Sequence, residues 1–171
     1  MEKGMLQVYT GDGKGKTTAA IGLAVRAAGA GLKVFIGQFV KSMEYNEIKI
    51  LKNIDNIDVE QYGLNCFIEK EPEQKDIKAA QEGLKEIREI LTSDKYDVVI
   101  LDEANIAVYF DLFSVDELIN VIDSRNEGIE VIVTGRKAKE KLMNKADLVT
   151  NMQEIKHYYE KGVQARDGIE R

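Results

Sequence analysis

The chain has 171 residues, of which 44% are hydrophobic, 32% are charged and one is proline. These values are typical of a single folded domain over residues 1–171 and exclude a disordered or collagen-like chain. The 24 lysines and arginines against 30 acidic residues give a net charge of −6, which argues against a nucleic-acid binder with a broadly basic face. One cysteine and one histidine exclude an internal disulfide, a cysteine-rich zinc site and a multi-histidine metal centre.

No apolar run is long enough to cross a bilayer, and the first residues lack the apolar core of a signal peptide. We therefore expect a cytoplasmic protein whose partners include neither a membrane nor a nucleic acid.

Short apolar runs alternate with segments of helical period along the chain. This alternation is typical of βαβ units and predicts an α/β fold with a mostly parallel sheet. Several of the runs are apolar throughout, so we expect helices on both faces and hence three layers. The predicted strands are residues 6–10, 34–39, 59–62, 98–101, 129–134 and 148–151.

The first predicted helix covers residues 18–28 and ends at one of the glycines that follow, and the second covers residues 75–91. A third begins after Ser114, because Glu117 three residues later completes a capping box. We expect an irregular loop over residues 63–74, and a C-terminal tail that is ordered only if something holds it. The residues of the second helix predicted to face the core are Ile77, Ala80, Leu84, Ile87 and Leu91.

The segment TGDGKGKTT lies between the first predicted strand and an alanine-rich predicted helix. Its glycines let consecutive backbone N–H groups turn around phosphate oxygens, and the helix N-terminus adds partial positive charge. Lys16 is expected to reach the phosphates, and the Thr17 hydroxyl to coordinate Mg²⁺. The alternative is a glycine-rich turn with two surface lysines. The candidate ATP-binding residues here are Thr10, which replaces the usual first glycine, then Gly11, Asp12, Gly13, Lys14, Gly15, Lys16, Thr17 and Thr18.

The charge distribution supports a phosphate site at this end of the chain. Residues 1–41 hold six basic and two acidic residues, a net charge of +4, whereas the remainder carries −10. The acidic total therefore conceals a basic N-terminal quarter suited to a triphosphate.

Two acidic residues end the apolar run near position 100. Asp102 is expected to hold Mg²⁺ directly or through water, and Glu103 would orient the attacking water in a hydrolase. The alternative is that the pair only caps the following helix. With the glycine-rich loop, these residues predict an ATP or GTP binder that uses Mg²⁺.

Further residue blocks go beyond a generic nucleotide site. In order and spacing they resemble the P-loop corrinoid adenosyltransferases, and they span nearly the whole chain. The blocks are TGDGKGKTTAA (10–20), Arg26, QFVK (38–41), ILDE with Asn105 (100–105), VTGR (133–136), ADLVT (146–150), KH (156–157), GV (162–163) and GIE (168–170).

The resemblance implies a RecA-like P-loop NTPase fold and transfer of the 5′-deoxyadenosyl group of ATP to the cobalt(I) of a corrinoid, with triphosphate leaving. It also implies that Lys16, Thr17, Asp102 and Glu103 serve the reaction, the last three around Mg²⁺. In such a reaction Glu103 would arrange the metal shell rather than activate water, because hydrolysis would waste ATP.

The resemblance also implies four residues that contact the substrates. Arg26 and Arg136 would contact the nucleotide, and the alternative for each is a surface arginine. Phe67 and His157 would face the corrinoid. The alternatives are that Phe67 anchors a loop and that His157 only hydrogen-bonds in the core.

The resemblance further implies a homodimer and an electron-donating flavoprotein as reductant. The family has a tryptophan two positions after Phe67, where this chain has Glu69, so the choice between cobalamin and an earlier corrinoid stays open. The rival function is a thymidine kinase-like phosphotransferase, a family that normally carries a cysteine zinc lasso; a third is a module that only senses nucleotide.

Overall fold

The computed structural model describes residues 2–41, 45–63 and 71–170. In this part of the chain six strands form one sheet in the order β3-β2-β4-β5-β1-β6, and every neighbouring pair is parallel. The strands are β1 (Leu6–Thr10), β2 (Val34–Phe39), β3 (Ile57–Tyr62), β4 (Val98–Asp102), β5 (Glu130–Thr134) and β6 (Leu148–Asn151).

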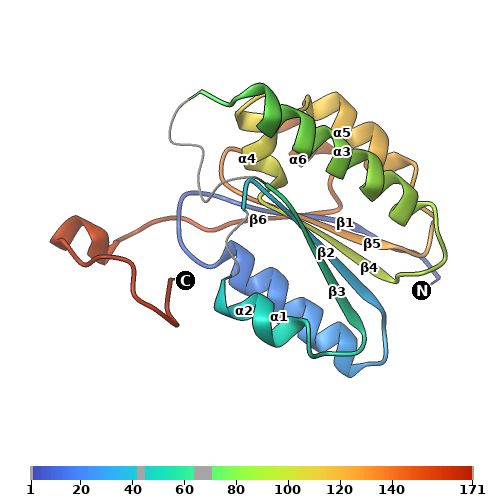
Figure 1. Ribbon diagram of the computed structural model, residues 1–171, viewed down its shortest axis with the longest axis horizontal. Helices are drawn as coiled ribbons and strands as arrows, with labels where there is room; N and C mark the ends of the chain where they lie inside the picture. The colour runs from blue at the N-terminus through green and yellow to red at the C-terminus, as the bar shows by residue number, and fades with distance from the viewer. Residues whose placement is uncertain (1, 42–44, 64–70, 171) are drawn as a thin grey trace.

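Helices cover both faces of the sheet, with α1 and α2 on one side and α3 to α6 on the other (Figure 1). The predicted three-layer α/β architecture is confirmed, and it is consistent with a RecA-like P-loop fold. β5 separates β1 from β4, so the glycine-rich loop and the acidic strand end lie two strands apart. The helices are α1 (Lys16–Gly29), α2 (Asn46–Leu51), α3 (Gln74–Leu91), α4 (Ala104–Tyr109), α5 (Val115–Asp123) and α6 (Glu140–Lys145).

The central strands are buried on both faces, as their uninterrupted apolar sequences predict. In β4, Val98 and Ile100 belong to the core beneath α1 and α2, whereas Val99 and Leu101 belong to the core beneath α3 to α5. β6 differs: all four of its residues are exposed, and in the described part of the chain it lies at the edge of the sheet beside β1.

Helix α1 packs against the middle of the sheet through small side chains. Ala20, Ala24 and Ala27 recur at helical spacing and are buried against the sheet. The helix ends where predicted. The Gly31 N–H donates to the Ala28 carbonyl oxygen at 2.9 Å. Gly31 has a φ of 83°, a conformation that glycine adopts without strain.

Most predicted elements are present with boundaries shifted by one or two residues. The capping box of α5 is confirmed, because the Ser114 and Glu117 side chains each bond the other residue's backbone N–H. Three helices were not predicted from the sequence: α2, α4 and α6. Each has six residues, fewer than two turns, which is too short for an apolar period to show.

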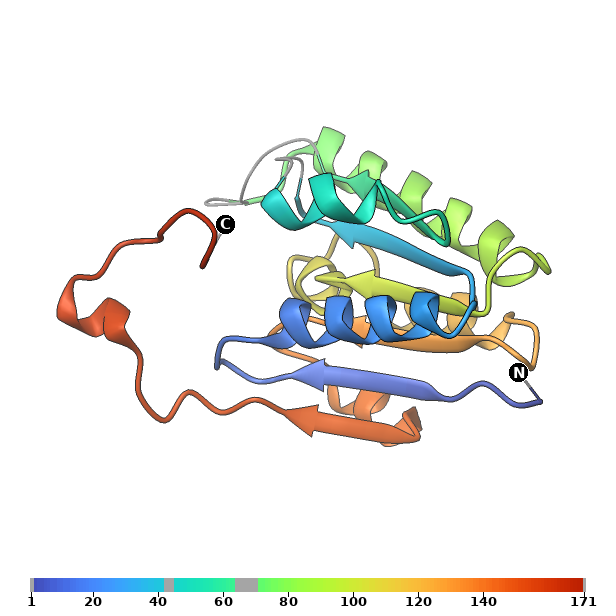
Figure 2. The same ribbon diagram turned by 90° about the horizontal axis from the view of Figure 1, so that it is seen from below.

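After β6 the chain leaves the sheet and curls back, as Figures 1 and 2 show. We call residues 152–170 the C-terminal arm; it contains the single-turn helix η1 (Tyr158–Lys161). The arm lies at the carboxyl end of the strands, opposite the N-terminus (Figure 2). No helix in the described part of the chain is long and apolar enough to cross a membrane.

Candidate active site

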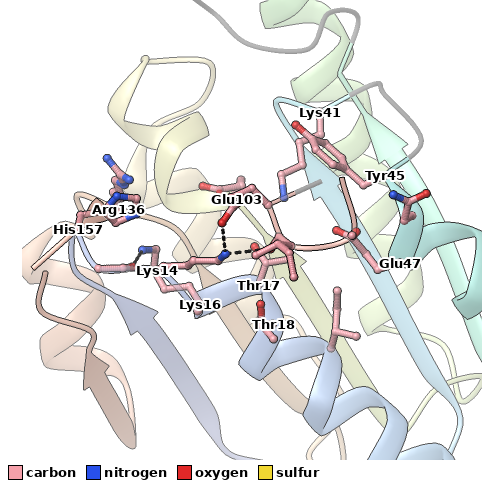
Figure 3. A pocket seen from close by; sticks show the side chains of 17 residues that line it. Lys14, Lys16, Thr17, Thr18, Lys41, Tyr45, Glu47, Glu103, Arg136 and His157 are labelled. Atoms are coloured by element: carbon pink, nitrogen blue, oxygen red, sulfur yellow. Dashed lines mark hydrogen bonds and ion pairs between the residues drawn. The ribbon is translucent and has the colours of Figure 1, made fainter. Parts of the chain in front are cut away.

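A pocket of about 530 Å³ opens at the carboxyl ends of the strands, the edge where parallel α/β sheets bind ligands. Figure 3 shows side chains from the start of α1 and from the ends of β2 and β4 directed toward it. Its lining residues are Gly13, Lys14, Gly15, Lys16, Thr17, Thr18, Ile21, Lys41, Tyr45, Asn46, Glu47, Glu103, Arg136, His157, Gly168, Ile169 and Glu170.

The glycine-rich loop forms one wall of the pocket and leads into α1, whose N-cap is Gly15. The Lys16 side chain turns back over the loop, and its Nζ donates to the carbonyl oxygens of Gly11 and Gly13, both at 2.7 Å. Burial, and then the nearby charge of Arg136, lower the pKa of Lys16. The loop therefore holds a buried cation against its own carbonyls, a position from which it can turn to an anion.

The same loop packs closely on the start of the C-terminal arm. The Gly13 N–H donates to the Met152 carbonyl at 2.7 Å. Gly11 has a φ of 96°, and a methyl group added there would overlap Asn151 and Met152. A side chain at Gly11 would be strained and would push the loop away from β6, so the close approach requires glycine.

Asp102 is the centre of the hydrogen-bond network at the strand ends. Its Oδ1 accepts from the hydroxyls of Thr17 at 2.9 Å and Thr134 at 2.6 Å. Its Oδ2 accepts from Gln38 Nε2 at 3.1 Å and Lys41 Nζ at 2.9 Å. Asp102 is 1% exposed, and these four donors use the positions at which a carboxylate ordinarily accepts.

The strand order brings these donors together. Gln38 lies opposite Asp102 in the register of β2 and β4, and Thr134 ends β5 on the other side of β4. Thr134 also accepts the Glu103 N–H at 3.1 Å, so its hydroxyl connects the two acidic residues.

Asp102 and Lys41 form a buried ion pair. Burial alone would raise the pKa of Asp102, but Lys41, Thr134 and Thr17 outweigh it and the pKa is lowered. Burial alone would lower the pKa of Lys41, but Asp102 and then Glu103 outweigh it and the pKa is raised. Both residues are therefore charged around neutral pH.

Glu103 follows β4 in a left-handed conformation with a φ of 57°. It is the N-cap of α4, but its side chain makes no capping bond, so the structure does not support the alternative that the acidic pair serves as a helix cap. Burial, and then the charge of Asp102, raise the pKa of Glu103. In the described part of the chain no three His, Cys, Asp or Glu residues form a group that could hold a metal ion.

Lys14 is held by the C-terminal arm. Its Nζ donates to Glu170 Oε1 at 2.8 Å, to the Ile169 carbonyl at 2.9 Å and to the Tyr158 hydroxyl at 3.2 Å. On the other side of the pocket, Asn46 of α2 donates to Asp167 at 2.7 Å. The arm thus connects the glycine-rich loop with α2.

The structure brings together most of the predicted site residues, but not all. Arg26 lies in the last turn of α1, away from the pocket lining, a placement that does not support its predicted contact with the nucleotide. Phe67 lies outside the described residues. His157 lines the pocket, and its Nδ1 accepts the Tyr159 N–H at 3.1 Å. Asp12 lies on the surface, where its Oδ1 is 3.5 Å from Lys137 Nζ.

The sequence reasoning missed three side chains of the network: Gln38, Lys41 and Thr134. Gln38 and Lys41 belong to the QFVK block, and Thr134 to the VTGR block. The signal that could have found them is their position at strand ends, where polar residues follow apolar runs.

Comparisons with known proteins agree over the whole chain. The family model described as ATP:corrinoid adenosyltransferase BtuR/CobO/CobP matches residues 2–171. The chain is 32% identical over 169 residues to the corrinoid adenosyltransferase of Escherichia coli K12, covering 99% of this chain and 86% of the relative.

Two further relatives carry the same description. The corrinoid adenosyltransferase of a Sinorhizobium species is 34% identical over 174 residues, covering 99% of this chain and 81% of the relative. Corrinoid adenosyltransferase CobA of Salmonella typhimurium is 32% identical over 169 residues, covering 99% of this chain and 86% of the relative. Nothing in these comparisons favours the kinase alternative. The chain belongs to the ATP:corrinoid adenosyltransferase family.

Proposed function

We propose that the pocket binds ATP and transfers its 5′-deoxyadenosyl group to a reduced corrinoid. Cobalt(I) supplies the electron pair of the new Co–C5′ bond, the C5′–O bond breaks, and its electron pair leaves on the triphosphate. No proton is removed, so the site needs no general base; it needs alignment and stabilisation of the departing charge. The observation that carries this proposal is that Lys16 and Thr17 line one pocket, and that the Thr17 hydroxyl also bonds the buried Asp102 beside it.

The loop residues would bind the triphosphate. Lys16 can turn from the loop carbonyls to a phosphate, and Lys14 can exchange Glu170 for one. The N–H groups at the start of α1 point to the same space, where the partial positive charge of the helix favours an anion. Arg136 lines the pocket near Lys16 and would supply a further charged donor.

Thr17, Asp102 and Glu103 fit a magnesium site that is completed by phosphate oxygens. The Thr17 hydroxyl donates its proton to Asp102, so its oxygen can face a metal. The carboxylate of Asp102 is already fully bonded, and we propose that it acts through Thr17 or water, with Glu103 nearer the metal. Mg²⁺ bound there would offset part of the charge that gathers on the triphosphate.

The remaining assignments rest on family membership. We propose that residues 1–171 act as one adenosyltransferase domain, that His157 and Phe67 face the corrinoid, and that the enzyme works in the cytoplasm, where ATP is available. A flavoprotein would reduce the cobalt, and two copies of the chain would form a homodimer, which light scattering of the purified protein would measure.

Product analysis tests the reaction. The protein is mixed without oxygen with Mg²⁺, ATP and chemically reduced cob(I)alamin, and the products are separated. We expect deoxyadenosylcobalamin and triphosphate in equal amounts. Formation of ADP and phosphate alone, or no turnover with cobalamin and with incomplete corrinoids, would contradict the proposal. Parallel reactions with thymidine test the kinase alternative.

A further inference from the structure

Among the lysines and arginines that line the pocket in the described part of the chain, Lys41 is the one to which the proposed adenosyl transfer gives no part. It lies two residues after the end of β2, lines the pocket, and has a side chain that is 13% exposed. Val40 before it has a φ of 61°, a left-handed conformation that is costly for a β-branched residue. The chain thus adopts strained backbone where it delivers the Lys41 ammonium to the strand ends (Figure 3).

The position of Lys41 relative to Thr17 is fixed by Asp102. Thr17 donates to one oxygen of this carboxylate and Lys41 to the other, each at 2.9 Å. The ammonium of Lys41 is therefore separated from the Thr17 hydroxyl by a single carboxylate group. Any phosphate group that reaches Thr17 comes close to Lys41.

The charges around Lys41 show how it could serve two anions. Of the four donors to Asp102, only Lys41 is charged. An ammonium group has three N–H bonds, of which one is directed at Asp102. It can therefore keep this bond and donate a second one into the pocket, where the leaving group gains negative charge as the C5′–O bond breaks.

We propose that Lys41 contacts the triphosphate, holding Asp102 with one N–H and a phosphate oxygen with another. This inference rests on the proposed function for the identity of the leaving group. Its test is nevertheless separate, because binding of inorganic tripolyphosphate without Mg²⁺ requires neither turnover nor a corrinoid.

Lys41→Met alone does not decide the matter, because it leaves Asp102 buried without its counter-charge and can unfold the protein. The double variant Lys41→Met/Asp102→Asn removes one charge of each sign and keeps the net charge of the site. Tripolyphosphate binding in EDTA is measured by calorimetry, with circular dichroism to confirm folding. We expect the double variant to bind about 10- to 100-fold more weakly than the parent, as for a lost hydrogen bond to a charged group.

Two further variants complete the design. Asp102→Asn alone should bind tripolyphosphate more tightly than the parent, because it releases Lys41 from a competing anion. Lys33→Met removes the same charge before the other end of β2 and should bind within about 2-fold of the parent, since its contribution at that distance is screened. Parent-like affinity in the folded double variant would overturn the proposal and leave Lys41 as a counter-charge for Asp102 alone. A double variant that loses adenosyl transfer but binds tripolyphosphate as tightly as the parent would also overturn the proposal.

Discussion

Thr17 connects the glycine-rich loop to the acidic strand end. Its hydroxyl donates to Asp102 Oδ1, and α1 places it beside Lys16 in the pocket. A hydroxyl that gives its proton to a carboxylate keeps its lone pairs for a cation, so one small side chain both fixes the loop and prepares the proposed metal position.

Replacing this hydroxyl separates its role from simple packing. We expect Thr17→Ala to lower the rate of adenosyl transfer by about 100-fold, as for loss of one group that stabilises developing charge. Thr17→Ser keeps the hydroxyl and should retain activity within about 10-fold of the parent. Steady-state rates over a range of Mg²⁺ concentrations measure both. Equal losses in the two variants would show that the methyl group, rather than the hydroxyl, matters.

At the scale of elements, the placement of the loop depends on how closely α1 approaches the sheet. Ala24 is fully buried between them, whereas its neighbour Val25 is 48% exposed. Ala24→Leu should therefore reduce the free energy of unfolding by about 1–3 kcal/mol, the usual cost of overpacking a core. Urea denaturation measures this loss.

The exposed neighbour provides the control. Val25→Leu adds one methylene at the surface of the same helix, and we expect it to change stability by less than about 0.5 kcal/mol. If Ala24→Leu is as stable as Val25→Leu, α1 can move away from the sheet, and the close contact between Ala24 and the sheet is not required.

Elements with a local signal could be predicted from the sequence, and contacts between strands could not. The Ser114–Glu117 capping box and the spacing of apolar residues in α3 depend on residues within a few positions of each other. The Lys41–Asp102 pair joins residues 61 positions apart. It exists because β2 and β4 are neighbours in the sheet, and that order cannot be read from the sequence pattern of either strand.

At the scale of the whole molecule, the C-terminal arm returns to the pocket and bonds Lys14 of the glycine-rich loop. Glu170 bonds Lys14, and Arg166 bonds Glu170 in turn. A phosphate that binds Lys14 competes with this carboxylate. If Lys14 binds a phosphate of ATP, as proposed, the free energy of the ion pair is subtracted from that of ATP binding.

We expect Glu170→Gln to bind ATP several-fold more tightly than the parent, as measured by calorimetry at low salt. Glu160→Gln, an exposed change on the same arm, should have no effect. Weaker ATP binding by Glu170→Gln would contradict competition between Glu170 and phosphate for Lys14. It would show instead that the C-terminal arm, bonded to Lys14, helps to hold the nucleotide. In Lys14→Met the effect of Glu170→Gln should disappear, because the competing pair no longer exists.

Lowering the pH to 5 should not neutralise Glu170 and so should not have the effect of Glu170→Gln. Hydrogen bonds from Arg166, Lys14 and Tyr158 hold the pKa of Glu170 well below its usual range. A carboxyl group with a lowered pKa keeps its contribution to stability above its unfolded pKa and loses it only as the pH falls through the lower, folded value. The difference in ATP affinity between Glu170→Gln and the parent should therefore persist unchanged from pH 8 to pH 5.

The location of the C-terminal arm also determines which end of the chain is better suited to a fused tag. Glu170 lines the pocket, whereas the N-terminus lies at the opposite end of the sheet (Figure 2). An affinity tag fused after Arg171 would be separated by one residue from Glu170, whose side chain bonds Lys14 of the glycine-rich loop. Purification tags, immobilisation linkers and fluorescent fusions are therefore better attached at the N-terminus, away from the pocket.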